Sequence, residues 1–216
     1  LVVSPVHSSL LKKLKIDYNV TYHPKITYKE LEKEILEKNL VILRSGINID
    51  KNIINKSNKL KFIVRAGTGL DNIDVKYAQK RGIKIFNFPN LNSTAVAELA
   101  FGLIISLYRH IVNANNELKK NLWNKQKFYG YELKNKVLGL VGLGNIGREI
   151  AKLAKGFSMD LLANVKNKKK KRPKNIKIVS LKHLFQNSDI IVLCLPLVKQ
   201  TKNLVDLKML KLIKKS

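Results

Sequence analysis

The chain has 216 residues, 45% of them hydrophobic, and a formal net charge of +27 at pH 7. This length holds one large or two small domains, and the hydrophobic content is enough for a packed core. No apolar run reaches the roughly 18 residues of a membrane span, and the start of the chain lacks the basic-then-apolar order of a signal peptide. The single cysteine excludes an internal disulfide framework and predicts a reducing, cytoplasmic location.

The net charge has two interpretations. Basic patches capture phosphate backbones, which would make the chain a nucleic-acid-binding module. Alternatively, the lysines are spread over the surface of an ordinary enzyme. Lysines occur in nearly every segment, and aromatic residues are not interleaved with them. We therefore favour the second interpretation and expect neither a nucleic-acid nor a membrane partner, although the charge would speed the arrival of anionic substrates.

Strand and helix patterns alternate over the first part of the chain. The predicted strands are 1–3, 18–22, 40–43, 62–64 and 83–87, and the predicted helices are 10–16, 27–38, 53–57 and 75–81. The last of these helices stops at Gly82, as helices commonly do. Strands that alternate with helices indicate the α/β class, with a parallel sheet and helices on both faces.

The longest predicted helix runs from about residue 93 to residue 112, and Asn92 or Ser93 can cap it. Its apolar residues cover much of its circumference, so we expect it to be largely buried. A long buried helix between two α/β halves is typical of an interdomain spine. The polar connector that follows, at 113–131, holds the only tryptophan, Trp123.

A strand, a glycine turn and a helix then follow one another. The run 137–141 is rich in valine and leucine, Gly142, Gly144 and Gly147 have the spacing G-x-G-x-x-G, and 148–154 has helical spacing. In this context the pattern indicates a dinucleotide-binding turn. We expect Gly142 to allow the tight turn, Gly144 to let a pyrophosphate approach the helix N-terminus, and Gly147 to allow close packing. The alternative is a glycine turn between ordinary elements.

The remaining elements continue the alternation of strands and helices. The predicted strands are 159–163, 176–179 and 189–196, the predicted helices are 181–186 and 207–213, and the lysine-rich run 166–173 is a predicted solvated loop. The last strand is strongly apolar, which predicts that it is buried, and it ends at Pro196.

Four stretches, in this order, resemble the D-isomer-specific 2-hydroxyacid dehydrogenases, and among them the D-3-phosphoglycerate dehydrogenase branch. They are 65–74 (RAGTGLDNID), 87–98 (NFPNLNSTAVAE), the glycine turn 142–147 (GLGNIG) and 194–201 (CLPLVKQT). One such stretch would be weak evidence, whereas four in family order are strong. The resemblance covers nearly the whole chain and implies an oxidoreductase with a nicotinamide cofactor.

The resemblance implies two doubly wound parallel-sheet domains with the active site in the cleft between them. Residues 1–82 would be a flavodoxin-like substrate-binding domain, and 83–216 an incomplete Rossmann NAD-binding domain that includes the interdomain helix 93–112. Family chains return to the first domain at their C-terminal end, and no residues remain here for that return. Because the first residue is also not methionine, we expect a piece of a longer chain. Family members are commonly dimers through the nucleotide domain, so we expect a homodimer when the chain is complete.

By resemblance, the substrate would contact Arg44, Ser45, Ala66, Gly67 and Asn92. Arg44 and Ser45 would hold its anionic groups, because an arginine fork matches a carboxylate or phosphate through two parallel hydrogen bonds. The backbone of residues 66–68 would line the substrate carboxylate. Three alternatives stay open, namely Arg44 as a surface residue at a strand end, Gly67 and Gly69 as simple turn glycines, and Asn92 as a helix cap.

By resemblance, the cofactor would contact Thr68, Gly142, Gly144, Asn145, Ile146, Gly147, Val165, Cys194, Leu195 and Pro196. Thr68 would lie on the nicotinamide side, and Asn145 and Ile146 would meet the pyrophosphate. Residues 194–196 would wall the pocket. For Cys194 by itself we favour a core residue over a reactive thiol.

Val165 departs from the family pattern. In the family an acidic residue ends the second nucleotide strand, about 20 residues past the fingerprint, and holds the adenosine ribose hydroxyls. Alignment on 159–163 places Val165 at that position, with Lys166 next. We prefer NAD, because a lysine-rich loop is expected in so basic a chain, and we keep NADP as the alternative because its 2′-phosphate would suit a site without a carboxylate.

The second departure is that the catalytic residues are missing. Hydride transfer from a 2-hydroxy acid needs a base for the hydroxyl proton, a role that suits histidine, and a cation for the carboxylate. The family's arginine, glutamate and histidine lie beyond the position that matches Ser216, and the four histidines here occupy no such motif. We expect no catalytic residue and no metal site in this chain, no activity from it alone, and marginal stability because of an open sheet edge.

Three functions follow from these observations. The favoured one is NAD-dependent hydride transfer to or from a small anionic 2-hydroxy acid, with 3-phosphoglycerate, in serine biosynthesis, as the leading substrate. The main alternative is a non-catalytic dinucleotide-binding protein similar to the co-repressor relatives of the family. A nucleic-acid-binding module is the third and rests on charge alone.

Overall fold

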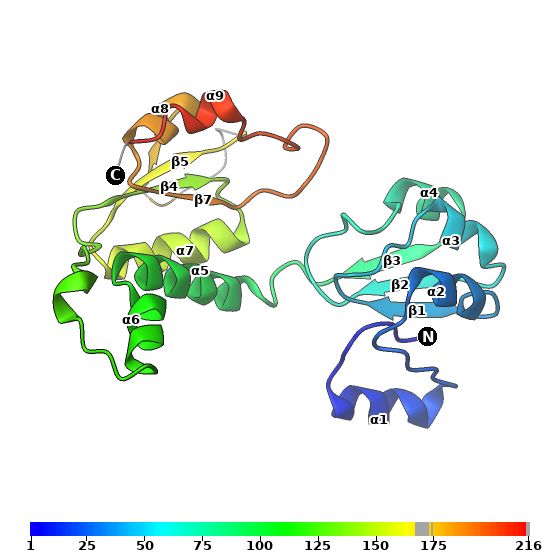
Figure 1. The fold of residues 1–216 in the computed structure, drawn as a ribbon. Helices are drawn as coiled ribbons and strands as arrows, with labels where there is room; N and C mark the ends of the chain where they lie inside the picture. The colour runs from blue at the N-terminus through cyan, green and yellow to red at the C-terminus, as the bar shows by residue number, and fades with distance from the viewer. Residues whose placement is uncertain (167–172, 174, 215–216) are drawn as a thin grey trace. The chain divides into compact units, whose positions relative to one another are not determined.

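The structure is a computed structural model that describes residues 1–166, 173 and 175–214 (Figure 1). The predicted lysine-rich loop falls almost entirely outside these residues. The chain divides into two compact units, Leu1–Asn92 and Ser93–Ser216, which we call the first and second unit. Each is built on a parallel sheet, so the predicted α/β class is confirmed.

The sheet of the first unit contains β1 (Leu40–Leu43), β2 (Phe62–Arg65) and β3 (Lys84–Asn87), in that order and parallel. Val2 continues the sheet past β1, because it forms one bridge with Ile42 and one with Tyr22. The predicted strands at 1–3 and 18–22 are therefore reduced to single bridges. Counted along the chain, the order is 2-1-3-4-5, which is the flavodoxin-like order that the resemblance implied.

The boundary between the units differs from the predicted one. Strand β3 pairs with β2 over its whole length, from Phe62 opposite Lys84 to Arg65 opposite Asn87. Backbone hydrogen bonds to β2 thus fix β3 in the first unit, and the division falls after Asn92 rather than after Gly82. The prediction that residues 83–92 belong with the nucleotide-binding part is wrong.

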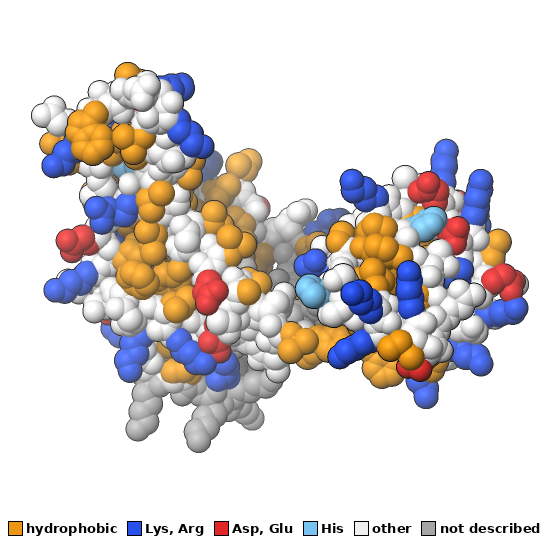
Figure 2. All heavy atoms as spheres, turned by 90° about the horizontal axis from the view of Figure 1, so that it is seen from below, with side chains coloured by type: hydrophobic (Ala, Val, Ile, Leu, Met, Phe, Trp, Pro, Cys, Tyr) orange, Lys and Arg blue, Asp and Glu red, His pale blue; other side chains and the backbone are white. Residues whose placement is uncertain are grey.

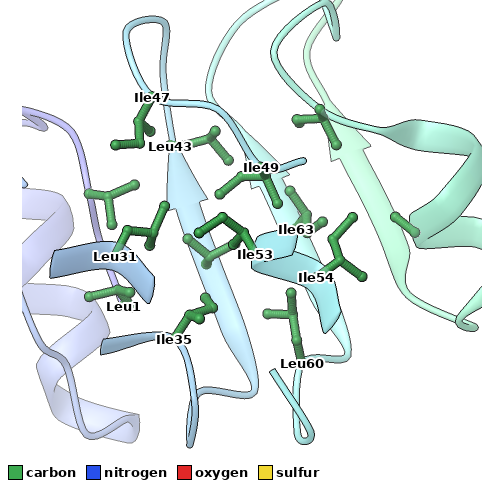
Figure 3. Close-up of a cluster of buried hydrophobic side chains, with 14 of the residues drawn as sticks. Leu1, Leu31, Ile35, Leu43, Ile47, Ile49, Ile53, Ile54, Leu60 and Ile63 are labelled. Carbon is green, nitrogen blue, oxygen red and sulfur yellow. The ribbon is translucent and has the colours of Figure 1, made fainter. Parts of the chain in front are cut away.

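Three helices bury their apolar residues against the sheet of the first unit. They are α2 (Tyr28–Glu34), α3 (Lys51–Lys56) and α4 (Val75–Lys80), and their N-caps Thr27, Asp50 and Asp74 accept hydrogen bonds from amides of the first turn. Figure 3 shows Leu31 and Ile53 beside Leu43 of β1, and all three side chains are fully buried. Helix α1 (Ser8–Asp17) buries no residue.

The sheet of the second unit has the order β6-β5-β4-β7 and is parallel throughout. Its strands are β4 (Val137–Val141), β5 (Asp160–Asn164), β6 (Lys177–Ile178) and β7 (Ile190–Leu193). Counted along the chain, this order is 3-2-1-4, the first four strands of the Rossmann order 3-2-1-4-5-6. The predicted Rossmann arrangement is confirmed over the described strands.

Helices cover both faces of this sheet (Figure 1). Helices α5 (Ser93–Tyr108) and α7 (Asn145–Gly156) pack with Leu138 and Leu140 on one face, and α8 (Leu181–Asn187) packs on the other with α9 (Leu207–Leu210) beside it. Gly139 lets α8 come close, because a β-carbon there would lie 2.6 Å from Leu184 Cδ2. The sheet and its two layers hold the end of β4 in place.

The predicted helix 93–112 is broken in two. His110 has a left-handed backbone (φ 52°), and α6 (Ile111–Leu118) leaves α5 at an angle of 65°. A short 3₁₀ helix follows at Lys125–Phe128. In the described part of the chain no single helix passes the length and hydropathy test for a membrane span, and the bent α5–α6 pair passes it only when joined.

Helix α5 is also less buried than its sequence predicts. Ala97, Phe101 and Ile104 face the core, whereas Leu99 and Leu107 are 64% and 75% exposed. An apolar residue is buried only where another element covers its face, and here α7 covers one side of α5. The prediction of a largely buried helix is therefore wrong for the outer face.

The basic side chains are dispersed. In Figure 2, Lys and Arg side chains are spread over the visible surface of both units instead of forming one stripe. On this face, the described Lys and Arg side chains form no single basic stripe.

Candidate functional site

The glycine turn at the end of β4 has the geometry that its sequence predicts. Gly142 has φ +101°, a conformation that side chains disfavour, and a β-carbon there would lie 2.7 Å from the carbonyl oxygen of Cys194. A β-carbon on Gly147 would lie 2.5 Å from the carbonyl oxygen of Gly142. The predicted roles of Gly142 in the turn and of Gly147 in close helix packing are confirmed.

Gly144 is the N-cap of α7 and borders open space. No atom lies within 4 Å of the position that its β-carbon would take, and no side chain caps the helix. Asn145, which is exposed, and Ile146, which is half-buried against the core, begin the helix. A helix N-terminus of this kind presents amides and a partial positive charge to an anion.

Residues 194–196 lie beside the glycine turn. The amide of Cys194 donates to Val141 O at 2.8 Å and so extends the β4–β7 ladder by one residue. Leu195 Cδ2 would lie 2.8 Å from a β-carbon on Gly142, and the carbonyl of Pro196 accepts a hydrogen bond from Thr201 Oγ1 at 2.6 Å. A cavity of about 310 Å³ opens among residues 193–205.

Cys194 is not poised for thiolate chemistry. Burial raises the pKa of its thiol to about 11. A thiol with so high a pKa is almost fully protonated at neutral pH and is a poor nucleophile. The structure therefore supports the interpretation of Cys194 as a core residue of the turn.

Val165 directly follows β5, at the edge of the sheet where β4 also ends. The register pairs Val141 with Asn164, so Val165 lies one residue beyond the ladder. Asn164 uses its side-chain amide to donate to Val179 O at 2.9 Å. No carboxylate occupies this strand end among the described residues, and Lys166 is exposed, so the geometry favours neither NAD nor NADP.

A second cavity, of about 450 Å³, lies at the carboxyl ends of β1, β2 and β3 in the first unit. It is lined by Arg44, Ser45, Arg65, Ala66, Gly67, Phe88, Leu91 and Asn92. All five predicted substrate residues are among them. Sequence reasoning missed Arg65, Phe88 and Leu91 as lining residues, although Arg65 stands at the end of β2 beside Leu43 and Asn87 in the register.

The loop after β2 is held by hydrogen bonds within the first unit. Ala66 N donates to Leu43 O and Gly67 N to Arg65 O, each at 2.8 Å. Ala66 and Gly67 line the cavity, and these two N–H groups already have partners within the chain.

Thr68 and Asn92 are joined to each other. Thr68 Oγ1 donates to Asn92 Oδ1 at 2.9 Å, and Asn87 Nδ2 donates to Thr68 O at 2.8 Å. Asn92 thus ties the loop after β2 to the segment that leads into α5, and it lines the cavity at the same time. Thr68, predicted on the nicotinamide side, lies in this loop.

Arg44 is anchored by its backbone and leaves its side chain exposed. Its amide donates to Ser4 Oγ at 2.9 Å, and its carbonyl accepts from Asn72 Nδ2 at 3.1 Å. Arg44 is one of the residues that line the cavity, and its role as a substrate-binding residue stays a prediction.

None of the four described histidines lines either cavity. His110 contacts Tyr129 O through Nε2 at 3.1 Å, and His7 caps α1 by accepting from the amide of Ser9. Among the described residues, no group of three or more His, Cys, Asp or Glu side chains could hold a metal ion.

Taken by itself, the second unit is a dinucleotide-binding fold with a G-x-G-x-x-G turn at a helix N-terminus. The family described as "D-isomer specific 2-hydroxyacid dehydrogenase, NAD binding domain" matches residues 101–216. This match covers more than half of the chain, which therefore belongs to the D-isomer-specific 2-hydroxyacid dehydrogenase family. The predicted family is confirmed.

Similar curated proteins carry three different names. A D-3-phosphoglycerate dehydrogenase from Methanocaldococcus jannaschii is 35% identical; the match covers 100% of this chain and 42% of that protein. A hydroxypyruvate reductase from Thermotoga maritima is 42% identical over 82% of this chain and 58% of its own length. A glyoxylate reductase from Pyrococcus horikoshii is 35% identical over 87% of this chain and 60% of its own length. The chain thus spans 42–60% of the length of these relatives.

Solved structures agree on the fold. One is an acyclic imino acid reductase in complex with NADPH and D-Arg, with a TM-score of 0.85 and 29% identity over 98% of this chain and 69% of that one. Another is a D-lactate dehydrogenase from Aquifex aeolicus complexed with NAD and lactic acid. It has a TM-score of 0.83 and 25% identity, and the match covers 96% of this chain and 63% of that one. NAD and NADPH thus both occur among the similar structures.

Proposed function

We propose that this chain forms the substrate-binding and nucleotide-binding part of an NAD-dependent oxidoreductase that acts on a small anionic 2-hydroxy acid. The observation that carries the proposal is the glycine turn, where Gly142 and Gly147 allow close packing and Gly144 leaves the helix N-terminus open. When bound, the nicotinamide would accept or supply the hydride. Residues 144–146 would hold the pyrophosphate through the N-terminus of α7.

The preferred substrate in this proposal is 3-phosphoglycerate, which would place the protein in serine biosynthesis. The cavity of the first unit has Arg44 and Ser45 on its wall, and guanidinium and hydroxyl groups suit phosphate and carboxylate oxygens. Relatives named D-3-phosphoglycerate dehydrogenase support this choice. Hydroxypyruvate and glyoxylate are the competing substrates, because similar relatives carry those names.

We further propose that the chain needs more residues to turn over substrate. Hydride transfer to or from a hydroxy acid requires a proton acceptor or donor within hydrogen-bond reach of the hydroxyl. No histidine or carboxylate occurs among the residues that line the cavity of the first unit. This cavity would bind and orient an acid, and a base from elsewhere would complete the site.

The proposal also includes a homodimer in the cytoplasm. Leu99, Leu103 and Leu107 of α5 are all more than half exposed, as are Val112 and Trp123 further along the chain. Apolar surface of this kind favours protein–protein contact. The single cysteine fits a reducing compartment, and the dispersed lysines support a small-molecule partner rather than nucleic acid.

Nuclear magnetic resonance of the isotopically labelled chain tests the nucleotide site. Addition of NADH should shift the amide signals of Gly144, Asn145 and Ile146, because the pyrophosphate would lie against them. Shifts confined to residues far from α7, or no shifts at millimolar NADH, would overturn the proposal. In the longer protein, NADH binding without turnover of any 2-hydroxy or 2-oxo acid would instead favour the non-catalytic, co-repressor-like alternative.

A further inference from the structure

Arg65 lines the cavity of the first unit, and its side chain folds back onto its own loop. A β-carbon added to Gly67 would lie 1.4 Å from Nη1 of Arg65 and 2.7 Å from its Cζ. The guanidinium therefore occupies the space that any side chain at position 67 would fill. Gly67 is thus more than a turn residue, because its missing side chain makes room for an arginine head group.

Within the described part of the chain, no carboxylate pairs with Arg65. Its Nε is buried and has no hydrogen-bond partner. Among the residues that the structure describes, neither Arg65 nor Arg44 forms an ion pair with a carboxylate. Asp71, the nearest acid along the loop, has its Oδ1 directed toward Gly69 and pairs with neither arginine. A buried guanidinium nitrogen without a partner is unfavourable unless a ligand supplies the acceptor.

Two arginines therefore lie at one cavity of a size that suits a small acid. Arg44 follows β1 and Arg65 ends β2, and these neighbouring parallel strands end at the same edge of the sheet. Both arginines line the same cavity of about 450 Å³. A 2-hydroxy acid with a single carboxylate needs only one of these guanidinium groups.

We propose that Arg65, seated over Gly67, is a specificity-determining residue that together with Arg44 selects 2-hydroxy acids with a second anionic group. This inference rests on the proposed function and deepens it, because it distinguishes acids with a second anionic group from glyoxylate and hydroxypyruvate. The planar fork of Arg65 suits two oxygens of a phosphate or of a second carboxylate. Phe88 and Leu91 line the same cavity and add apolar surface beside the two arginines.

The test is the affinity of the chain for matched acids, measured by calorimetry at fixed ionic strength. D-glycerate carries one carboxylate, 3-phosphoglycerate adds a phosphate, and 2-hydroxyglutarate adds a second carboxylate. The unmodified chain should bind both of these acids about tenfold or more tightly than glycerate. If only 3-phosphoglycerate binds more tightly than glycerate, the second group that Arg65 recognises is a phosphate. If 2-hydroxyglutarate also binds more tightly, any second anionic group is sufficient.

Variants distinguish a specific contact with the Arg65 guanidinium from the general attraction of anions to a positively charged chain. Arg65→Met should remove the preference and leave the glycerate affinity within about twofold of its original value, and Gly67→Ala should do the same by displacing the guanidinium. Arg65→Lys should keep only part of the preference, because a lysine has charge without the fork. Arg81→Met is the matched control, because Arg81 lies outside the cavity and contacts Asn55, and it should bind all three acids as the unmodified chain does.

Three results would overturn the inference. The preference for acids with a second anionic group could persist in Arg65→Met, it could fall equally in Arg81→Met, or it could be missing from the unmodified chain while glycerate still binds. In the last case the proposed function stands and only the role of Arg65 is wrong. If the unmodified chain binds none of the three acids, the proposed substrate site fails together with the inference.

Discussion

The α-carbon of Gly147 stands so close to the backbone of Gly142 that a β-carbon on Gly147 would lie 2.5 Å from the Gly142 carbonyl oxygen. We predict that Gly147→Ala destabilises the second unit by about 1–3 kcal/mol, because backbone rather than a flexible side chain must move. Gly156→Ala is the control, since nothing lies within 4 Å of its β-carbon position. Urea denaturation of both variants measures the difference. Equal stabilities would mean that Gly147 is not a packing residue.

Gly139 makes a similar prediction on the opposite face of the sheet. A β-carbon there would lie 2.6 Å from Leu184 Cδ2 and 2.3 Å from Ser188 Oγ. Gly139→Ala should push α8 away from β4 and reduce the free energy of unfolding by about 1–3 kcal/mol. Because position 139 lies away from the glycine turn, NADH affinity should change much less than stability does. A large loss of NADH binding with unchanged stability would contradict this reasoning.

Cys194 gives a prediction about pH. Its pKa is raised by burial from 9.0 to about 11, so the folded protein disfavours the thiolate. Well below pH 9 the thiol is neutral in both the folded and the unfolded chain, so the pH does not change the stability there. As the pH rises from about 9 toward 11, the unfolded chain loses the thiol proton more readily than the folded chain, so the free energy of unfolding falls. Thiol labelling of the folded chain at pH 8 should be much slower than labelling in urea. Equally fast labelling in both conditions would show an accessible, ionised cysteine.

Val165 tests the choice between NAD and NADP. A carboxylate at this position would accept hydrogen bonds from the ribose hydroxyls and repel a 2′-phosphate. Val165→Asp should therefore tighten NADH binding and weaken NADPH binding, changing their ratio by about tenfold or more. Lys155→Gln makes the same change in net charge at an exposed site near the far end of α7 and should leave the ratio unchanged. If both variants shift the ratio equally, the effect is only one of overall charge.

The glycine turn was predictable because its constraints are local. A positive φ at Gly142 and close packing at Gly147 follow from three residues of one short segment, so the sequence pattern carries them directly. The cavity of the first unit was predictable for a related reason. Arg44, Ala66 and Gly67 follow strands, and parallel strands bring their carboxyl ends to one edge.

Other features depend on contacts that no local pattern encodes. The position of β3 is set by its pairing with β2, so the boundary after Asn92 could not be found from segment composition. The outer face of α5 carries large apolar residues just as its inner face does, and the position of α7 decides which face is buried. Arg65 was missed because a strand pattern does not show that its guanidinium folds over Gly67.

The most direct test of the account is the NADH affinity of Gly144→Val. Gly144 has an extended backbone and open space at its β-carbon position, so valine should lower the unfolding free energy by no more than about 1 kcal/mol, the cost of a poorer N-cap. The new side chain would occupy the approach of the pyrophosphate to the N-terminus of α7, so the dissociation constant for NADH should rise more than about tenfold. A stable Gly144→Val chain that binds NADH as tightly as the unmodified one would contradict the central claim.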